Sequence, residues 1–234
     1  MTRNTFRTPA GHEVTAVTAA GMREVDRVAV EEVGLQLLQM MENAGRALAW
    51  HVRTVRDDES VVVVAGDGGN GGGGLTCARH LANRDVPVRV VLDRPPEDLS
   101  GAAAHQCRIL DATDVTVGTG PEAIDRFDEP TVHVDALVGY GVRGEVRPPA
   151  ANHIEALNRI ADLVVSLDVP SGMDATTGDT NGVRVHPDRT VTLALPKTGL
   201  DALDADLVLA DIGLPSGVYD RLDIPVERPF GEGS

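Results

Sequence analysis

A run of four valines followed by a glycine-rich segment constrains this chain more than any other feature. Residues 61–64 are all valine, and residues 66–74 are all glycine except Asp67 and Asn70. An uncharged valine run is typical of a fully buried parallel strand. The pattern of residues 75–83 is helical, so the glycines predict a loop between a strand and a helix. Backbone amides in such a turn can close on an anion at the helix N-terminus. The sequence therefore predicts a nucleotide or dinucleotide ligand.

Composition limits the other partners that the chain could have. A length of 234 residues fits one domain with a substantial core, and alternating apolar strands and helical segments indicate an α/β fold. Only 3% of the residues are aromatic, and the formal net charge is −15. Nucleic-acid binding requires a basic face and often aromatic stacking platforms. We therefore expect no nucleic-acid partner.

The basic residues are also unusual, because Lys197 is the only lysine among the 21 basic residues. An acidic, lysine-poor chain is typical of halophilic proteins, since a salty cytoplasm screens the repulsion between dense carboxylates. A high-GC genome is the alternative explanation, because it also replaces lysine with arginine. The survival of Lys197 suggests a structural or site role, such as an ion pair in the ligand crevice.

The chain shows no sign of secretion or membrane insertion. Its N-terminus lacks an apolar signal core, and no stretch approaches the ~18 apolar residues of a membrane span. Cys77 and Cys107 are too few for a disulfide framework and lack metal-ligand spacing. Cys77 is interpreted as a small packed residue. We expect a cytoplasmic protein without membrane contact.

Hydrophobic periodicity divides the chain into alternating helices and strands. We expect a polar, loosely held tail from Pro215 and neither an internal repeat nor an interdomain linker. The expected helices cover residues 15–54, 75–83, 98–111 and 150–160, and the expected strands cover 61–64, 87–93, 115–117, 131–135, 163–168, 190–194 and 206–210.

Three of these strands lead into polar or glycine-rich segments, at residues 66–74, 135–145 and 168–174. Ligands of doubly wound sheets bind beyond the carboxyl ends of the strands. We therefore expect the three segments to meet at one crevice.

Several motif interpretations compete for the glycine segment. Gly66, Gly68 and Gly71 satisfy the dinucleotide fingerprint G-x-G-x-x-G, and Asp93 ends the next strand, where an acid could hold a ribose hydroxyl. A strand-end residue facing solvent is the simpler interpretation of Asp93. A P-loop is excluded because Leu75-Thr76 stands where the motif needs lysine and a hydroxyl residue.

A serine hydrolase is also a poor fit. Ser171 lies in Val-Pro-Ser-Gly rather than in G-x-S-x-G, and no histidine is a clear partner for it. His133 lies inside an expected strand, so it is interpreted as a packed residue.

Six segments taken together resemble the motifs of the NAD(P)HX epimerase family, also known as YjeF N-terminal domains. Met40-Met41-Glu42-Asn43-Ala44-Gly45 is similar to the L-M-E-N-A-G helix of that family, and the glycine segment is similar to its G-N-N-G-G-D-G. The other four segments are residues 134–141, 167–174, 195–200 and 210–215, and the resemblance covers residues 15–215 in order.

The resemblance implies a three-layer αβα sandwich, Rossmann-like, with a mostly parallel central sheet in a single domain over residues 1–234. It also implies a homodimer that interconverts the R and S epimers of hydrated NADH and NADPH (NADHX and NADPHX). A separate dehydratase would then consume the S epimer. That dehydratase domain, often fused C-terminally in the family, is expected to be absent from this chain.

The resemblance also implies roles for individual residues. Asn70, Asp135 and Ser171 would hold a potassium ion, to which all three can offer oxygen donors. Asp168 would face the nicotinamide and act as the catalytic carboxylate, although it could instead cap the turn at Val169-Pro170. The residues implied to contact the dinucleotide are Gly69, Asn70, Gly71, Gly72, Gly73, Gly139, Tyr140, Gly141, Val142, Arg143, Gly144, Glu145 and Asp168.

The chain departs from the family pattern inside the site. Gly69 stands in place of an asparagine and Gly73 in place of an aspartate, while Tyr140 replaces a threonine. Glycine keeps the backbone cradle but offers no side-chain contact. A catalytically impaired, nucleotide-binding paralogue that acts as a sensor or interaction module is therefore the alternative to an active epimerase.

Overall fold

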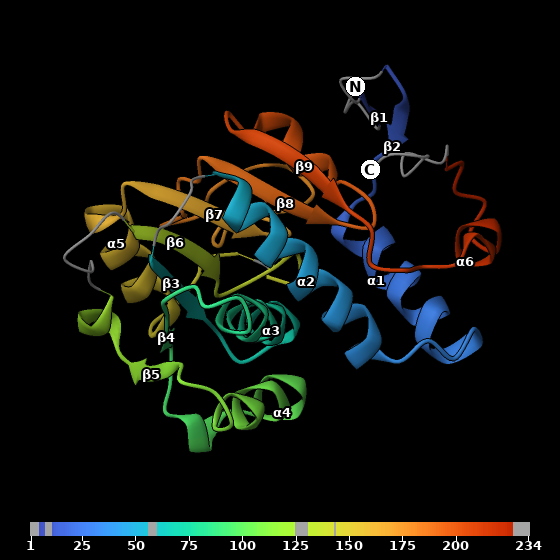
Figure 1. Ribbon diagram of the computed structural model, residues 1–234. Helices are drawn as coiled ribbons and strands as arrows, with labels where there is room; N and C mark the ends of the chain where they lie inside the picture. The colour runs from blue at the N-terminus through green and yellow to red at the C-terminus, as the bar shows by residue number, and fades with distance from the viewer. Residues whose placement is uncertain (1–4, 8–10, 56–59, 125–130, 143, 227–234) are drawn as a thin grey trace.

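The central element of the fold is a seven-stranded parallel sheet with the order β5-β4-β3-β6-β7-β8-β9 (Figure 1). The computed structural model describes residues 5–7, 11–55, 60–124, 131–142 and 144–226. All seven strands expected from the sequence are confirmed. They are β3 (Ser60–Ala65), β4 (Val88–Leu92), β5 (Thr116–Thr119), β6 (Thr131–Ala136), β7 (Leu163–Leu167), β8 (Arg189–Leu193) and β9 (Asp206–Ala210).

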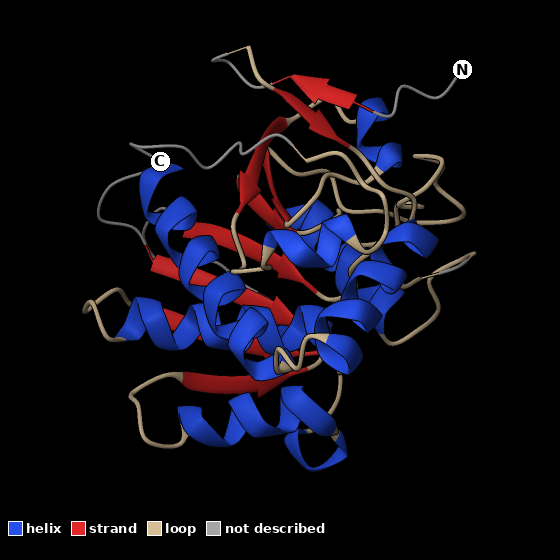
Figure 2. Ribbon diagram, turned by 90° about the vertical axis from the view of Figure 1, so that its right-hand side faces the viewer, coloured by secondary structure: helices blue, strands red, loops and turns tan. Residues whose placement is uncertain are grey.

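Helices cover both faces of the sheet. The side chains of α2 (Leu37–Val55), α3 (Gly69–Ala82) and α4 (Gly101–Leu110) pack with Val61 and Val63 on one face. The helix α5 (Ala150–Ile160) packs with Val62 and Val64 on the other. Alternate valines of β3 thus serve two separate cores, which explains why the whole strand is apolar. The expected three-layer αβα sandwich is confirmed (Figures 1 and 2).

Smaller elements surround this sandwich. The N-terminal region contains α1 (Ala19–Arg27) and the π-helix η1 (Val28–Glu32) ahead of α2, which agrees with the two successive helices expected over residues 15–54. A separate antiparallel hairpin, at the top of Figure 2, precedes them. The remaining elements are β1 (Thr5–Arg7), β2 (Glu13–Thr15), the 3₁₀ turns η2 (Pro96–Asp98), η3 (Pro121–Ala123) and η4 (Thr198–Ala202), and α6 (Ser216–Asp220).

Two sequence-based expectations are wrong. The glycine segment is not a loop up to Gly74, because α3 already begins at Gly69. The expectation of a loosely held tail from Pro215 is wrong for the residues of α6. Val218 and Tyr219 are buried there in the same core as Val25 of α1. Apolar packing of these two side chains outweighs the polar composition around them.

The order of the strands places a ligand crevice between β3 and β6. From β3 the chain adds β4 and β5 on one side, and then β6, β7, β8 and β9 on the other side. Adjacent loops lead in opposite directions at such a switch point, which leaves a crevice beyond the carboxyl ends of the strands. In the described part of the chain, no helix has the length and apolarity needed to cross a membrane.

Candidate functional site

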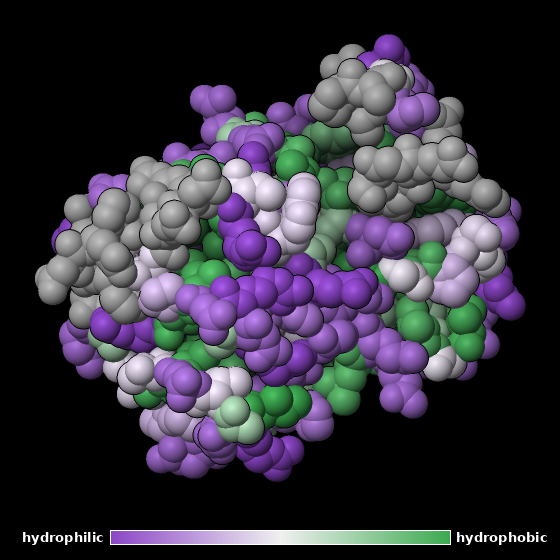
Figure 3. All heavy atoms as spheres, viewed as in Figure 1, coloured by the Kyte–Doolittle hydropathy of each residue, from purple (hydrophilic) through white to green (hydrophobic). Residues whose placement is uncertain are grey.

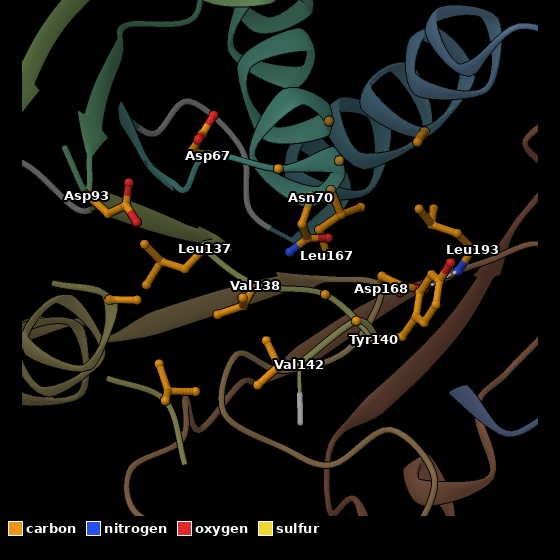
Figure 4. Close-up of a pocket in the computed structure, with 18 of the residues that line it drawn as sticks. Asp67, Asn70, Asp93, Leu137, Val138, Tyr140, Val142, Leu167, Asp168 and Leu193 are labelled. Atoms are coloured by element: carbon orange, nitrogen blue, oxygen red, sulfur yellow. Dashed lines mark hydrogen bonds between the residues drawn. The ribbon is translucent and has the colours of Figure 1, made fainter. Parts of the chain in front are cut away.

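A cavity of about 1110 Å³ opens at the carboxyl ends of β3, β6 and β7. The three segments that were expected to meet all contribute to it, through Gly69, Gly139 and Asp168. Figure 4 shows two distinct ends, with Asp67 and Asp93 at one, Tyr140, Asp168 and Leu193 at the other, and Asn70 between them. The volume is slightly above the usual range of roughly 300–1,000 Å³ for small-molecule sites.

The start of α3 forms one wall of this cavity. Gly69, Asn70 and Gly73 line it, whereas Gly71 and Gly72 lie behind the wall. Gly72 donates the first helical hydrogen bond, to the carbonyl of Gly68 at 2.9 Å. The amides of the three residues before Gly72 precede this bond, and such amides at a helix N-terminus favour a bound anion.

Close packing explains why so many glycines lie at this helix start. A Cβ atom on Gly71 would lie 1.7 Å from the carbonyl oxygen of Gly66, and one on Gly72 would lie 2.5 Å from the sulfur of Met41. A Cβ on Gly69 would meet no atom within 4 Å. The glycines therefore let the helix approach β3 and α2 rather than form a long flexible loop.

We expect Gly71→Ala to lower the free energy of unfolding by about 1–3 kcal/mol, because backbone must move to admit the methyl group. The matched variant Gly69→Ala adds the same methyl group to the same helix without a clash, and alanine is the better helix former. It should be neutral or slightly stabilising. Urea unfolding of both variants tests the packing, and equal stability of the two would contradict it.

The loop after β6 forms the opposite wall. Gly139, Tyr140, Gly141, Val142, Gly144 and Glu145 all line the cavity. Arg143, which was expected to do the same, lies outside the described residues. The Gly139 backbone is close to the start of α3, since a Cβ there would lie 3.1 Å from the side-chain oxygen of Asn70.

The structure brings Asp135 and Ser171 into direct contact beneath this loop. Both are fully buried, and the carboxylate of Asp135 accepts hydrogen bonds from the hydroxyl (2.5 Å) and amide (2.9 Å) of Ser171. Ser166 Oγ and the amide of Leu137 also donate to Asp135, at 2.8 and 3.3 Å. Burial raises the pKa of Asp135, although these hydrogen bonds oppose the rise.

Asn70 is connected to Asp135 and Ser171 only indirectly, by way of the loop after β6. The Ser171 hydroxyl accepts a hydrogen bond from the amide of Val138 at 2.9 Å, and the next residue along the chain, Gly139, faces Asn70. The side-chain nitrogen of Asn70 is buried without a hydrogen-bond partner among the described residues. An unpartnered buried amide is costly, so it marks a position that a ligand would satisfy.

Asp168 lies at the other end of the cavity in an ion pair with the single lysine. The backbone of Asp168 is in the left-handed region (φ 66°). Its amide donates a hydrogen bond to the Val191 carbonyl at 2.7 Å, which holds the backbone in place. The buried Lys197 ammonium donates to Asp168 Oδ1 and to the carbonyl of Leu193 (2.9 Å). The amide of Leu193 donates to the same Oδ1 at 3.3 Å. Asp168 therefore binds Lys197 rather than capping the Val169–Pro170 turn, and the expected crevice ion pair is confirmed.

The end of the cavity away from Asp168 is also charged. Asp93 accepts two hydrogen bonds from Arg94, at 2.9 and 3.1 Å, and Arg94 also contacts Asp67 at 3.3 Å. All three residues line the cavity. Asp93 is 7% exposed, so its interpretation as a solvent-facing strand end is wrong.

Sequence reasoning missed the contribution of α1, which supplies Arg23 and Asp26 to the cavity. Asp26 lies four residues after the buried Met22 and next to the buried Val25. An acidic residue within the apolar stripe of a helix was the available signal. Met40 and Met41 are buried and line the cavity, so they belong to the core of the chain.

Two residues set aside by the sequence analysis have no part in this cavity. Cys77 is fully buried, and burial raises the pKa of its thiol, so it is a packed residue as expected. His133 is buried within β6, which confirms its interpretation as a packed residue.

Comparisons with known proteins point to one family. Residues 37–199 match the family model described as YjeF-related protein N-terminus. The chain is 43% identical to an NAD(P)H-hydrate epimerase of Dehalogenimonas lykanthroporepellens, over 97% of this chain and 94% of that protein.

Longer relatives and a solved structure agree with this match. The chain is 36% identical to a bifunctional NAD(P)H-hydrate repair enzyme of Salinibacter ruber, covering 88% of this chain and 42% of that enzyme. It therefore spans about two fifths of the bifunctional relative. A yeast protein of known crystal structure superposes with a TM-score of 0.80 at 24% identity, over 94% of this chain and 97% of that chain, which supports the fold.

Proposed function

The chain belongs to the family of YjeF-related protein N-termini, and from this premise we propose that it is an NAD(P)H-hydrate epimerase. As an isomerase of nicotinamide nucleotide repair, it interconverts the R and S epimers of NADHX and NADPHX. One observation carries the proposal: a single cavity holds both the start of α3, whose free amides favour an anion, and the Asp168–Lys197 pair.

A dinucleotide fits this layout with its phosphates on α3 and its hydrated ring near Asp168. Gly69, Asn70 and Gly73 face the cavity on the phosphate side, and the segment from Gly139 to Glu145 runs along its other wall. Gly71 and Gly72 act from behind the wall, through the backbone that their packing holds in place.

Epimerisation inverts a hydroxyl-bearing carbon beside a ring nitrogen. Water can leave through an iminium ion and return on the other face, or the ring can open and reclose. Either route needs a proton donor and a proton acceptor at the ring. A carboxylate also stabilises the positive charge of an iminium ion that forms beside it. Asp168, which faces the cavity beside Lys197, supplies that carboxylate.

We also propose that Asn70, Asp135 and Ser171 hold a potassium ion. The donor set supports this assignment, since all three side chains offer the oxygen ligands that hard cations prefer. Asp135 is buried with only serine hydroxyls and backbone amides as partners among the described residues, so its carboxylate is not paired with a cationic side chain. The bound ion would offset the negative charge of the carboxylate and of the nearby phosphates.

The same proposal includes the setting of the enzyme. We expect a cytoplasmic homodimer that passes the S epimer to a dehydratase, an activity consistent with the bifunctional repair enzymes among its relatives. Apolar side chains around the η1–α2 turn support dimerisation, because Val30, Val33, Leu37 and Leu38 are each at least 36% exposed (Figure 3). The acidic surface fits a cytoplasm rich in salt.

The decisive experiment incubates the purified protein with the R epimer of NADHX and an S-specific dehydratase in concentrated potassium chloride. Chromatography of the two epimers reports the rate of conversion. We expect conversion well above the spontaneous rate, and a lower rate in sodium chloride of equal ionic strength. If the folded protein does not accelerate conversion, the epimerase proposal is contradicted. The result would instead support a nucleotide-binding paralogue that has lost catalysis because Gly69 and Gly73 lack side chains.

A further inference from the structure

A second carboxyl group faces the cavity from the N-terminal helix. Asp26 on α1 lines the same end of the cavity as Asp168 and Lys197. The phenol of Tyr140, in the loop after β6, donates a hydrogen bond to Asp26 Oδ2. Tyr140 is also near Asp168, since the Lys197 ammonium that binds Asp168 is 5.7 Å from the centroid of the Tyr140 ring.

The three buried or half-buried carboxyl groups near this loop have different partners. Asp135 accepts four hydrogen bonds and is fixed in place. Asp168 forms an ion pair with the ammonium of Lys197. Within the described residues, the side chain of Asp26 has one hydrogen-bond partner, the uncharged phenol of Tyr140. Two carboxyl groups with such different partners in one cavity suit opposite roles in proton transfer.

We propose that Asp26 is the general acid of this site, and that Asp168, which is ion-paired with Lys197, is its general base. The proposal rests on the epimerase function and on the route through loss and return of water. The Asp26 carboxyl gives its proton to the leaving hydroxyl as the C–O bond breaks, and the ring nitrogen supplies the electron pair that forms the iminium ion.

The return step restores the balance of atoms and protons. A water molecule attacks the other face of the iminium carbon, the new C–O bond forms, and the electron pair returns to the ring nitrogen. The proton released by this water goes to the Asp168 carboxylate. Proton exchange with solvent then restores Asp26 and Asp168. Nothing is oxidised or reduced, and the product differs from the substrate only at the inverted carbon.

The surroundings of Asp26 shift its pKa upward, in the direction that suits a general acid. Burial raises its pKa, and the negative charge of Asp168 adds to the rise, while the Tyr140 hydrogen bond and the charge of Lys197 oppose it. Burial also raises the pKa of Tyr140, which therefore stays a neutral donor. The titratable and charged groups that face Asp26 are Tyr140, Lys197, Asp168, Tyr219 on α6 and Arg23 on its own helix.

Tyr140 is a positioning residue in this scheme, because it acts through Asp26. Its single hydrogen bond fixes the Asp26 carboxyl while leaving the other oxygen, Oδ1, free of partners in the described residues. An acid can reach a substrate hydroxyl only through such an available oxygen.

The test compares the wild type with Asp26→Asn, which keeps the shape of the side chain but carries no transferable proton. We expect kcat to fall by about 10²–10⁴-fold, with KM changed by less than about twofold, because phosphate binding lies at α3. In the wild type, kcat should decline as pH rises through the raised pKa of Asp26. This alkaline decline should vanish in Asp26→Asn and return in Asp26→Glu.

Two further variants complete the experiment. Tyr140→Phe should lower kcat less than Asp26→Asn does and should shift the alkaline decline rather than abolish it. Glu24→Gln, on the exposed side of the same helix, should leave both kcat and the pH profile unchanged.

The outcomes separate this proposal from the function on which it rests. If the wild type epimerises and Asp26→Asn keeps its rate and its alkaline decline, the assignment of Asp26 is wrong and the function stands. If kcat falls but the pH profile is unchanged, Asp26 is structural and the proposal is also overturned. If the folded wild type does not epimerise, the function is wrong and this proposal falls with it.

Discussion

Asp168→Asn is expected to lower kcat for epimerisation by about 10²–10⁴-fold, the usual contribution of a positioned acid or base. The change replaces one carboxylate oxygen by a nitrogen and removes the negative charge. Asparagine tolerates the left-handed backbone that Asp168 adopts at φ 66°. The amide oxygen can still accept hydrogen bonds from Lys197 and Leu193. The loss should therefore reflect chemistry rather than misplacement.

The control for this variant is Asp85→Asn. Asp85 also has a left-handed backbone, at φ 56°, but it is exposed and lies outside the cavity. It should keep full activity. Rates come from chromatography of the two epimers, and circular dichroism establishes that both variants fold. Turnover by Asp168→Asn at the wild-type rate would remove Asp168 from the mechanism.

The strands and their order along the chain could be predicted from the sequence. The strand β3 contains an uninterrupted run of valines because it is buried on both faces, so its sequence alone indicates a central strand. The meeting of three loops at one crevice could also be predicted, since it follows from a parallel sheet in which carboxyl ends share an edge.

The start of α3 could not be predicted, because glycine has a low intrinsic helix propensity. The helix forms there because Gly71, Gly72 and Gly74 pack within van der Waals contact of Gly66, Met41 and Ala136. Met41 and Ala136 come from distant parts of the chain, whereas Gly66 belongs to the same glycine segment. Tertiary packing thus reverses a local preference that sequence reasoning has to rely on.

The role of α1 in the site was missed for a similar reason. Asp26 meets Tyr140 across 114 positions of the sequence, and no local motif connects the two. A role for Lys197 was easier to predict, since a single lysine in an acidic chain is conspicuous. Its partner Asp168 could be guessed only as one of the acids at the ends of the strands.

Lys197→Met is expected to lower the free energy of unfolding by about 3–5 kcal/mol, because it leaves Asp168 buried without its counter-charge. The Lys197 side chain is 0% exposed and that of Asp168 is 5% exposed, so water is a poor replacement for the lost ammonium. Methionine fills much of the same volume, which limits any contribution from a cavity. Urea unfolding at constant ionic strength measures the loss.

A double-mutant cycle separates the ion pair from other effects. In the double variant Asp168→Asn/Lys197→Met no buried charge remains, so its loss should be clearly smaller than the sum of the two single losses. Arg189→Met is the matched control, since Arg189 pairs with the half-exposed Asp206 at the surface and should cost less than about 1 kcal/mol. Additive losses in the cycle would mean that Asp168 and Lys197 contribute independently, and their ion pair would then not stabilise the fold.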